Sequence, residues 1–178
     1  AQATVSLSNG DSIHYEKLLI ATGGSPVRLN VPGADNKGVY YLRSVDDADA
    51  IAAEARDGRR AVVVGAGFIG MEVAASLTQR GVKVTVLEAM PRVWPLFADE
   101  SLADFVRRYC EGRGVTFHTG DAVEALLGDE RVTSVRTRSG RDLPCDFACI
   151  GVGIRPRVEL AVAGGLKTDN GIVVDERM

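Results

Sequence analysis

The stretch RRAVVVGAGFIGMEVAASL, residues 59–77, decides the fold. Four apolar residues, Ala61–Val64, are typical of a buried strand, and three glycines follow at the spacing GxGxxG. The apolar run Phe68–Arg80 then predicts a helix, and VKVTVLE at 82–88 predicts a second strand. A strand, a glycine turn, a helix and a second strand form a βαβ unit, so we predict an α/β fold with a parallel sheet.

Further elements are predicted on both sides of this unit. Ser44 and Asp47 have the spacing of a capping box, which predicts a helix through about Asp57. A proline-broken loop at 90–98 precedes a helix over Asp99–Glu111. GVTFHT at 114–119 predicts another strand, and GIVVD at 171–175 a last short one. The segments AVEALL (122–127), VTSVRTRSG (132–140) and LPCDFACI (143–150) predict an antiparallel β-meander.

The N-terminal region repeats later in the chain. A hairpin turning at Asn9–Gly10 leads into Leu18–Ala21, which we predict to be a buried interior strand, and residues 25–42 are expected to be a crossing linker. NGDSIHYEKLLIATGGSP at 9–26 aligns with SGRDLPCDFACIGVGIRP at 139–156 at a constant offset of 130. We expect the two segments to share one architecture.

The three glycines suit a phosphate site at the start of a helix. Gly65 permits the tight turn, Gly67 leaves room for a pyrophosphate, and Gly70 lets the helix pack closely on the strand. Backbone N–H groups at a helix N-terminus then face the anion. We therefore predict that the loop binds a dinucleotide through Gly65, Ala66, Gly67, Phe68, Ile69 and Gly70.

An acid closes the second strand. Glu88, 18 residues after Gly70, is placed to accept hydrogen bonds from both hydroxyls of an adenosine ribose. Glu88 would repel a 2′-phosphate, which Arg92 could in principle accept, so NADH is favoured over NADPH. A ligand-free tight turn and a methyltransferase loop are weaker interpretations of the same glycines. Glu72 is either a first-turn acid that interacts with the helix dipole or a polar contact to the nicotinamide.

Composition excludes several classes of function. The 178 residues are 46% apolar and carry a net charge of −3, which gives no reason to expect nucleic acid or membrane partners. Cys110, Cys145 and Cys149 form no CxxC, so we expect reduced core cysteines of a cytoplasmic protein rather than a redox pair at the last two. His14 and His118 are solitary and are expected to be ordinary strand residues. We assign no catalytic residue and no metal ligand.

Several motifs together resemble the two-dinucleotide flavoprotein reductases. They are GAGFIGMEVAASL, VTVLEAMPRV, ATGGSP, VPGAD, GVGIRPRVELA and GGLKTDNGIVVD. The chain resembles the NAD(H)-binding domain of FAD-dependent pyridine nucleotide-disulfide oxidoreductases, closest to ferredoxin and rubredoxin reductases and to apoptosis-inducing factor. The resemblance implies Rossmann-like, three-layer, doubly wound domains and hydride transfer from NADH to FAD, then electron transfer to an iron–sulfur protein. It places Glu72 by the nicotinamide and Gly153 at the same end of the site, although Arg157 stands where asparagine is commoner.

The resemblance also implies a domain organisation. We expect residues 1–26 to be a strip of the FAD-binding domain with the crossing strand, 27–156 the NAD(H)-binding domain, and 157–178 the return into the FAD-binding domain. The FAD glycine loop would lie about 130 residues upstream of Gly65, so the isolated chain is expected to lack FAD and to be inactive. The acceptor stays open among a ferredoxin, a rubredoxin, oxygen and a disulfide. A non-catalytic NAD-sensing or interaction module is the alternative function.

Overall fold

The computed structural model describes residues 3–177, so the ends of the predicted domain ranges at residues 1, 2 and 178 lie outside the described residues. In chain order the elements are β1 (Thr4–Ser6), β2 (Ser12–His14), β3 (Gly24–Pro26), β4 (Val39–Tyr41), α1 (Val45–Glu54), β5 (Arg60–Val64), α2 (Phe68–Gln79), β6 (Lys83–Glu88), α3 (Glu100–Glu111), β7 (Thr116–Thr119), β8 (Val123–Leu127), β9 (Ser134–Thr137), β10 (Asp142–Pro144), β11 (Phe147–Ile150), β12 (Ile154–Pro156), α4 (Glu159–Ala163), β13 (Thr168–Asp169) and β14 (Gly171–Ile172).

A five-stranded parallel sheet lies at the centre of the fold, in the order β4-β11-β5-β6-β7. The chain runs from β5 through α2 to β6, and through α3 to β7, so these strands extend the sheet in one direction. Strands β11 and β4 lie on the other side of β5. The direction of strand addition therefore reverses at β5, and in such sheets ligands bind outside the carboxyl ends of the strands at this point.

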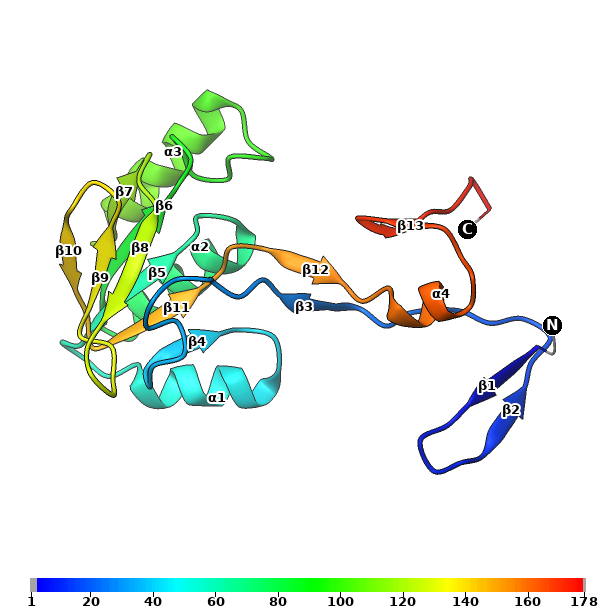
Figure 1. Cartoon of the computed structure of the whole chain (residues 1–178). Coiled ribbons are helices and arrows are strands. Elements are labelled where there is room, and N and C mark those ends of the chain that lie inside the picture. The colour runs from blue at the N-terminus through cyan, green and yellow to red at the C-terminus, as the bar shows by residue number, and fades with distance from the viewer. Residues whose placement is uncertain (1–2, 178) are drawn as a thin grey trace. The chain divides into compact units, whose positions relative to one another are not determined.

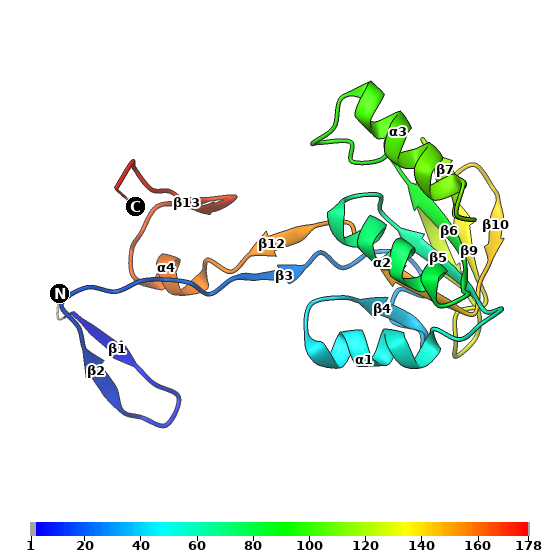
Figure 2. The same ribbon diagram turned by 180° about the vertical axis from the view of Figure 1, so that it is seen from behind.

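Two cores cover the two faces of the sheet, because side chains alternate along each strand. Ala61 and Val63 of β5 pack with residues of α1, α2 and α3, whereas Val62 and Val64 pack with the meander β8–β10. Figures 1 and 2 show the sheet from opposite sides, with the meander over one face and α2 over the other. The fold is thus three-layered, in the order helices, parallel sheet and antiparallel meander.

The described residues form two compact units. The larger comprises Pro26–Ile154, and the smaller comprises the described residues up to Ser25 and from Arg155. The smaller unit holds the hairpin β1–β2, helix α4 and the short pair β13–β14. Strands β3 and β12 pair with one another and differ by the repeat offset of 130.

The hydrogen bonds beside this pair repeat at the same offset. The N–H of Val27 donates to the carbonyl of Gly153 at 2.9 Å, and the N–H of Arg157 donates to the carbonyl of Gly23 at 2.9 Å. Adding 130 to Val27 and subtracting it from Gly153 converts the first bond into the second. The two repeat segments are therefore related by a local two-fold where β3 and β12 pair, as well as by sequence similarity.

Several predicted elements are confirmed. Ser44 caps α1, its side chain accepts from the N–H of Asp47, and the Asp47 carboxylate accepts in return from the N–H of Ser44. Asp99 caps α3 by accepting from the N–H of Leu102. The βαβ unit, the N-terminal hairpin and the antiparallel arrangement of β8–β10 are also present. His14 and His118 lie in strands β2 and β7, as predicted.

Three predicted elements are wrong, and the end of one helix is displaced. LPCDFACI is two strands, because the chain leaves the meander after β10 and β11 enters the parallel sheet between β4 and β5. Leu18–Ala21 is not a strand and Leu19 is 81% exposed, because no described strand pairs with this apolar run. The predicted linker at 25–42 contains β4, which pairs with β11 and so forms the sheet edge. Helix α1 also ends at Glu54, three residues before the predicted Asp57.

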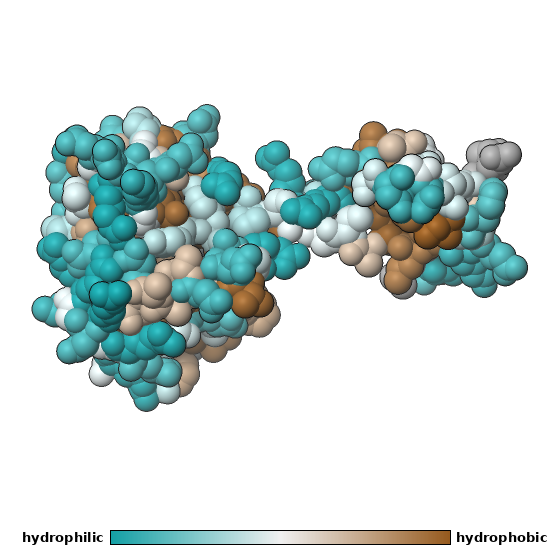
Figure 3. Space-filling model, turned by 90° about the horizontal axis from the view of Figure 1, so that it is seen from below, coloured by the Kyte–Doolittle hydropathy of each residue, from teal (hydrophilic) through white to brown (hydrophobic). Residues whose placement is uncertain are grey.

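One face of the larger unit is mostly hydrophilic. Figure 3 shows hydrophilic residues over most of its visible face, with hydrophobic residues in separate patches. Within residues 3–177, no helix combines the length and the apolar character that crossing a bilayer requires.

Candidate functional site

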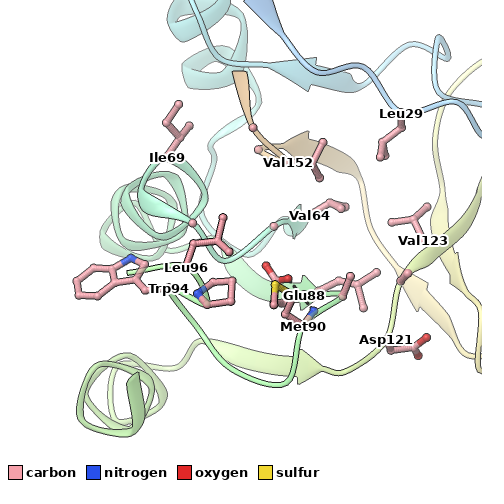
Figure 4. A pocket seen from close by; sticks show the side chains of 18 of the residues that line it. Leu29, Val64, Ile69, Glu88, Met90, Trp94, Leu96, Asp121, Val123 and Val152 are labelled. Carbon is pink, nitrogen blue, oxygen red and sulfur yellow. Dashed lines mark hydrogen bonds between the residues drawn. The ribbon is translucent and has the colours of Figure 1, made fainter. Parts of the chain in front are cut away.

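A cleft of about 740 Å³ opens in the larger unit at the carboxyl ends of the parallel strands. Residues that follow β5, β6, β7 and β11 line it, together with the loop before α3, the segment 29–31 and one turn of the meander. Figure 4 shows Glu88 near the middle of the cleft, with Trp94 on one side and Asp121 on the other. The cleft therefore lies where the reversal of strand order predicts a ligand site.

Two of the three glycines are required by the fold itself. Gly65 has φ +99°, and a Cβ there would lie 2.4 Å from the carbonyl oxygen of Gly151. A Cβ at Gly70 would lie 1.9 Å from the carbonyl oxygen of Gly65. Gly65 thus allows β5 to approach the turn after β11, and Gly70 allows α2 to pack against the end of β5.

Gly67 is different, because no packing contact within residues 3–177 requires its small size. Its φ of −75° and ψ of −171° suit any residue, and a Cβ there would have no heavy atom within 4 Å. Gly67 is the N-cap residue of α2, with no side-chain capping hydrogen bond, and it lines the cleft. The missing side chain leaves the space above a helix N-terminus open, which fits a bound pyrophosphate.

Glu88 is a buried carboxylate held by backbone donors. It is 8% exposed, its Oε2 accepts from the N–H of Ala66 at 2.6 Å, and its Oε1 accepts from the N–H of Met90 at 2.8 Å. Each carboxylate oxygen can accept more than one hydrogen bond, so both retain capacity toward ribose hydroxyls. The orientation of Glu88 in the cleft is thus fixed by backbone donors of the chain itself.

Ala66 is held at both backbone groups. Its N–H donates to Glu88, and its carbonyl accepts from the N–H of Trp94 at 2.8 Å. Ala66 is fully buried and does not line the cleft. Its N–H is therefore used in a hydrogen bond within the protein. Ala66 stabilises the loop from the inside and does not face the cleft.

The other predicted site residues fall into two groups. Phe68, Ile69 and Gly153 line the cleft with Gly65, Gly67 and Glu88. Glu72 is the fifth residue of α2, is exposed and lies outside the lining set, so it is not the predicted first-turn acid. Its contact with a nicotinamide stays a prediction.

Sequence patterns missed other residues of the cleft. Asp121 and Ala122 follow β7, and the rule that ligands bind beyond the ends of parallel strands would have indicated them. Arg138 comes from the meander, and the loop residues Trp94 and Phe97 come from the segment before α3. No local pattern marks these three, because their positions depend on how distant segments pack.

The three cysteines have raised pKa values, which are typical of unreactive thiols. Cys145 packs with the meander-side core and Cys149 with the helix-side core, so they lie on opposite faces of the sheet. Burial raises the pKa of both thiols to about 12, and burial also raises the pKa of Cys110. All three are free thiols with little thiolate at neutral pH.

The parallel sheet, the open helix N-terminus and the acid at a strand end are features of the Rossmann-like class of folds. The model of the family described as "Pyridine nucleotide-disulphide oxidoreductase" matches residues 1–178. The chain belongs to this family of FAD- and NAD(P)-dependent oxidoreductases.

Named relatives include electron-transfer reductases. "Probable ferredoxin reductase CtmF" of Castellaniella defragrans is 42% identical over 96% of this chain and 42% of its own length. The rubredoxin-NAD(+) reductase of Pseudomonas putida is 37% identical over 98% of this chain and 46% of its own length. The crystal structure of a ferredoxin reductase from Rhodopseudomonas palustris superposes with a TM-score of 0.94, at 36% identity over 99% of this chain and 44% of that structure. The chain thus spans less than half the length of these relatives.

Proposed function

We propose that this chain is the NADH-binding domain of a flavoprotein reductase that passes hydride from NADH to FAD, and then electrons to an iron–sulfur protein such as ferredoxin or rubredoxin. In the proposal, Pro26–Ile154 binds the nucleotide, and the residues on either side of it belong to an FAD-binding domain. The single observation that carries the nucleotide part is the open space at Gly67 beside the fixed carboxylate of Glu88. Similarity to a ferredoxin reductase and to a rubredoxin reductase supports the proposal that the electron acceptor is an iron–sulfur protein.

The residues of this chain have separate roles in the proposal. Backbone N–H groups at the start of α2 hold the pyrophosphate, and Glu88 holds the adenosine ribose. Gly153 and Val152, which follow β11, also line the cleft, and in the proposal they bound the nicotinamide. The bound dinucleotide supplies the hydride. The three free thiols, two of them buried, support a cytoplasmic location.

Titration of the chain with NADH and NADPH tests the assignment of Glu88. A carboxylate gains hydrogen bonds from ribose hydroxyls but repels a 2′-phosphate, which is worth roughly 1.5–3 kcal/mol. We expect NADH to bind about 10- to 150-fold more tightly than NADPH by the same energies. Nucleotide fluorescence or calorimetry measures both affinities.

The Glu88→Ala variant separates ribose recognition from support of the loop. Loss of the bond to Ala66 loosens the glycine loop and weakens both nucleotides alike, so the ratio of the two affinities reports the ribose contact alone. We expect the ratio to fall toward one in the variant. Equal affinities in the unmodified chain, or an unchanged ratio in Glu88→Ala, would remove Glu88 from the nucleotide site.

A further inference from the structure

Arg138 is an unpaired cation in the cleft. It follows β9 directly, is exposed, and is the only positively charged side chain among the described residues that line the cleft. Within residues 3–177 its guanidinium forms no hydrogen bond and no ion pair. The carboxylates that share the lining are those of Glu88 and Asp121.

The backbone of Arg138 is nevertheless fixed. Its N–H donates to the carbonyl of Ala122 at 2.8 Å. The next residue, Ser139, donates to Asp121 through its N–H at 3.2 Å and through its hydroxyl at 2.5 Å. Both carboxylate oxygens of Asp121 are therefore engaged with Ser139, and Arg138 is presented from a braced turn.

Backbone hydrogen bonds also relate Arg138 to Glu88. The N–H of Asp121 donates to the carbonyl of Glu88 at 3.1 Å, and the next residue, Ala122, accepts from Arg138. Three backbone segments thus lie side by side, in the order Glu88, Asp121–Ala122, Arg138. Neighbouring segments bonded in this way lie about 4.8 Å apart, and a single segment, Asp121–Ala122, separates the backbones of Glu88 and Arg138.

That separation suits the base of a nucleotide whose ribose lies at Glu88. A guanidinium is planar and packs on the face of an aromatic ring, which a lysine ammonium does less well. We propose that Arg138 is a further binding residue of the cleft, whose guanidinium packs on the adenine ring of the dinucleotide. The inference rests on the proposed function, because it requires the ribose to lie at Glu88.

The test measures the affinities of NADH and NADPH for the chain and for Arg138→Ala, Arg138→Lys and Arg56→Ala. Arg56, an exposed arginine between α1 and β5 at the end of the sheet opposite the cleft, is the matched control. We expect Arg138→Ala to weaken both nucleotides equally, by roughly 3- to 30-fold. Arg138→Lys should recover little of this loss, and Arg56→Ala should bind as the unmodified chain does. The melting temperatures should not differ, because both side chains are exposed.

Other outcomes overturn the inference in distinguishable ways. A loss confined to NADPH would place Arg138 on a 2′-phosphate, and full recovery by lysine would make it a point charge near the pyrophosphate. Unchanged affinity in Arg138→Ala, with NADH still bound by the unmodified chain, would reject Arg138 and leave the proposed function standing. Failure of the unmodified chain to bind NADH would reject both.

Discussion

At the scale of single residues, the three glycines of the GxGxxG motif have different roles. Gly65 and Gly70 are small because backbone atoms of the same chain lie 2.4 and 1.9 Å from where a Cβ would be. At Gly67 no described heavy atom lies within 4 Å of where a Cβ would be, so its small size serves the open cleft. Ala66, between the first two glycines, is fixed through Glu88 and Trp94. The acid proposed to bind ribose thus also sets the conformation of the loop proposed to bind phosphate.

Gly67→Val tests this division of duties. The valine side chain enters open space, so we expect the melting temperature to stay within a few degrees of that of the unmodified chain. The same side chain occupies the proposed phosphate position, so NADH affinity should fall at least about 100-fold, the cost of excluding a charged group from its hydrogen bonds. Thermal denaturation and NADH titration measure the two effects.

Gly70→Ala is the matched control for Gly67→Val. Its Cβ meets the carbonyl oxygen of Gly65, so this smaller substitution should lower the melting temperature markedly. If Gly67→Val unfolds the chain as readily as Gly70→Ala does, Gly67 is structural and the open phosphate site loses its support.

At the scale of elements, the segment between β6 and α3 forms an apolar wall of the cleft. Trp94 has φ +46°, the one positive φ of a non-glycine residue in the described chain. Its backbone N–H donates to the carbonyl of Ala66. Its ring contacts Phe68 and Phe97, with centroids 5.5 and 6.1 Å away. The indole Nε1 is buried and has no hydrogen-bond partner among the described residues. The ring is therefore used for packing and its polar atom is not.

Two substitutions of Trp94 separate these contributions. Trp94→Phe keeps an aromatic ring and removes a buried donor that costs about 1–3 kcal/mol when unpaired, so stability should not fall. Trp94→Ala removes the ring contacts and should lower the free energy of unfolding by about 2 kcal/mol. Chemical denaturation measures both, and a Phe variant as unstable as the Ala variant would show that the indole nitrogen has a partner.

At the scale of the whole larger unit, a charge network closes the end of the sheet opposite the cleft. Glu54, the last residue of α1, accepts from the Tyr40 hydroxyl at 2.7 Å, from Arg131 at 2.5 Å and from Arg59. Both arginines also donate to the carbonyl of Asp146, just before β11. One carboxylate thus connects α1, β4, the start of β5 and the meander.

The network makes the free energy of unfolding depend on pH. Burial alone would raise the pKa of Glu54, but hydrogen bonds from Arg131, Tyr40 and Arg59 outweigh it and hold the pKa below the ordinary value of 4.5. The stabilisation is therefore complete above pH 4.5 and is lost as the pH falls through the lower, folded-state pKa. Glu54→Gln should lower the free energy of unfolding by about 2 kcal/mol at pH 7. The difference from the unmodified chain should shrink toward pH 3.

Urea denaturation at several pH values checks this expectation, with Asp142→Asn as the control. Asp142 pairs with Arg136 on the exposed meander, so removing its charge should leave stability at pH 7 unchanged. If the free energies of unfolding of Glu54→Gln and the unmodified chain differ by the same amount at every pH, Glu54 stabilises the chain through packing and not through its charge.

The sequence by itself determined the features that depend on near neighbours in the chain. The spacing of Gly65, Gly67 and Gly70 after an apolar strand, and the acid at the next strand end, predicted the βαβ unit and the part of the cleft that this unit lines. Ser44 and Asp47 predicted the start of α1, because a capping box is satisfied within one helical turn. The repeat at 130 residues predicted one architecture for residues 9–26 and 139–156, but the pairing of β3 with β12 was found only in the structure.

Only the tertiary structure decided what distant segments do to one another. Leu18–Ala21 and Phe147–Ile150 are both apolar runs, but only the second has strands on both sides, β4 and β5, to pair with. Arg138 reaches the cleft because backbone bonds carry the meander turn to the end of β6, and no pattern within a few residues records that. Periodicity and caps are satisfied locally, whereas burial and the lining of a cleft depend on which segments, many residues apart, come into contact.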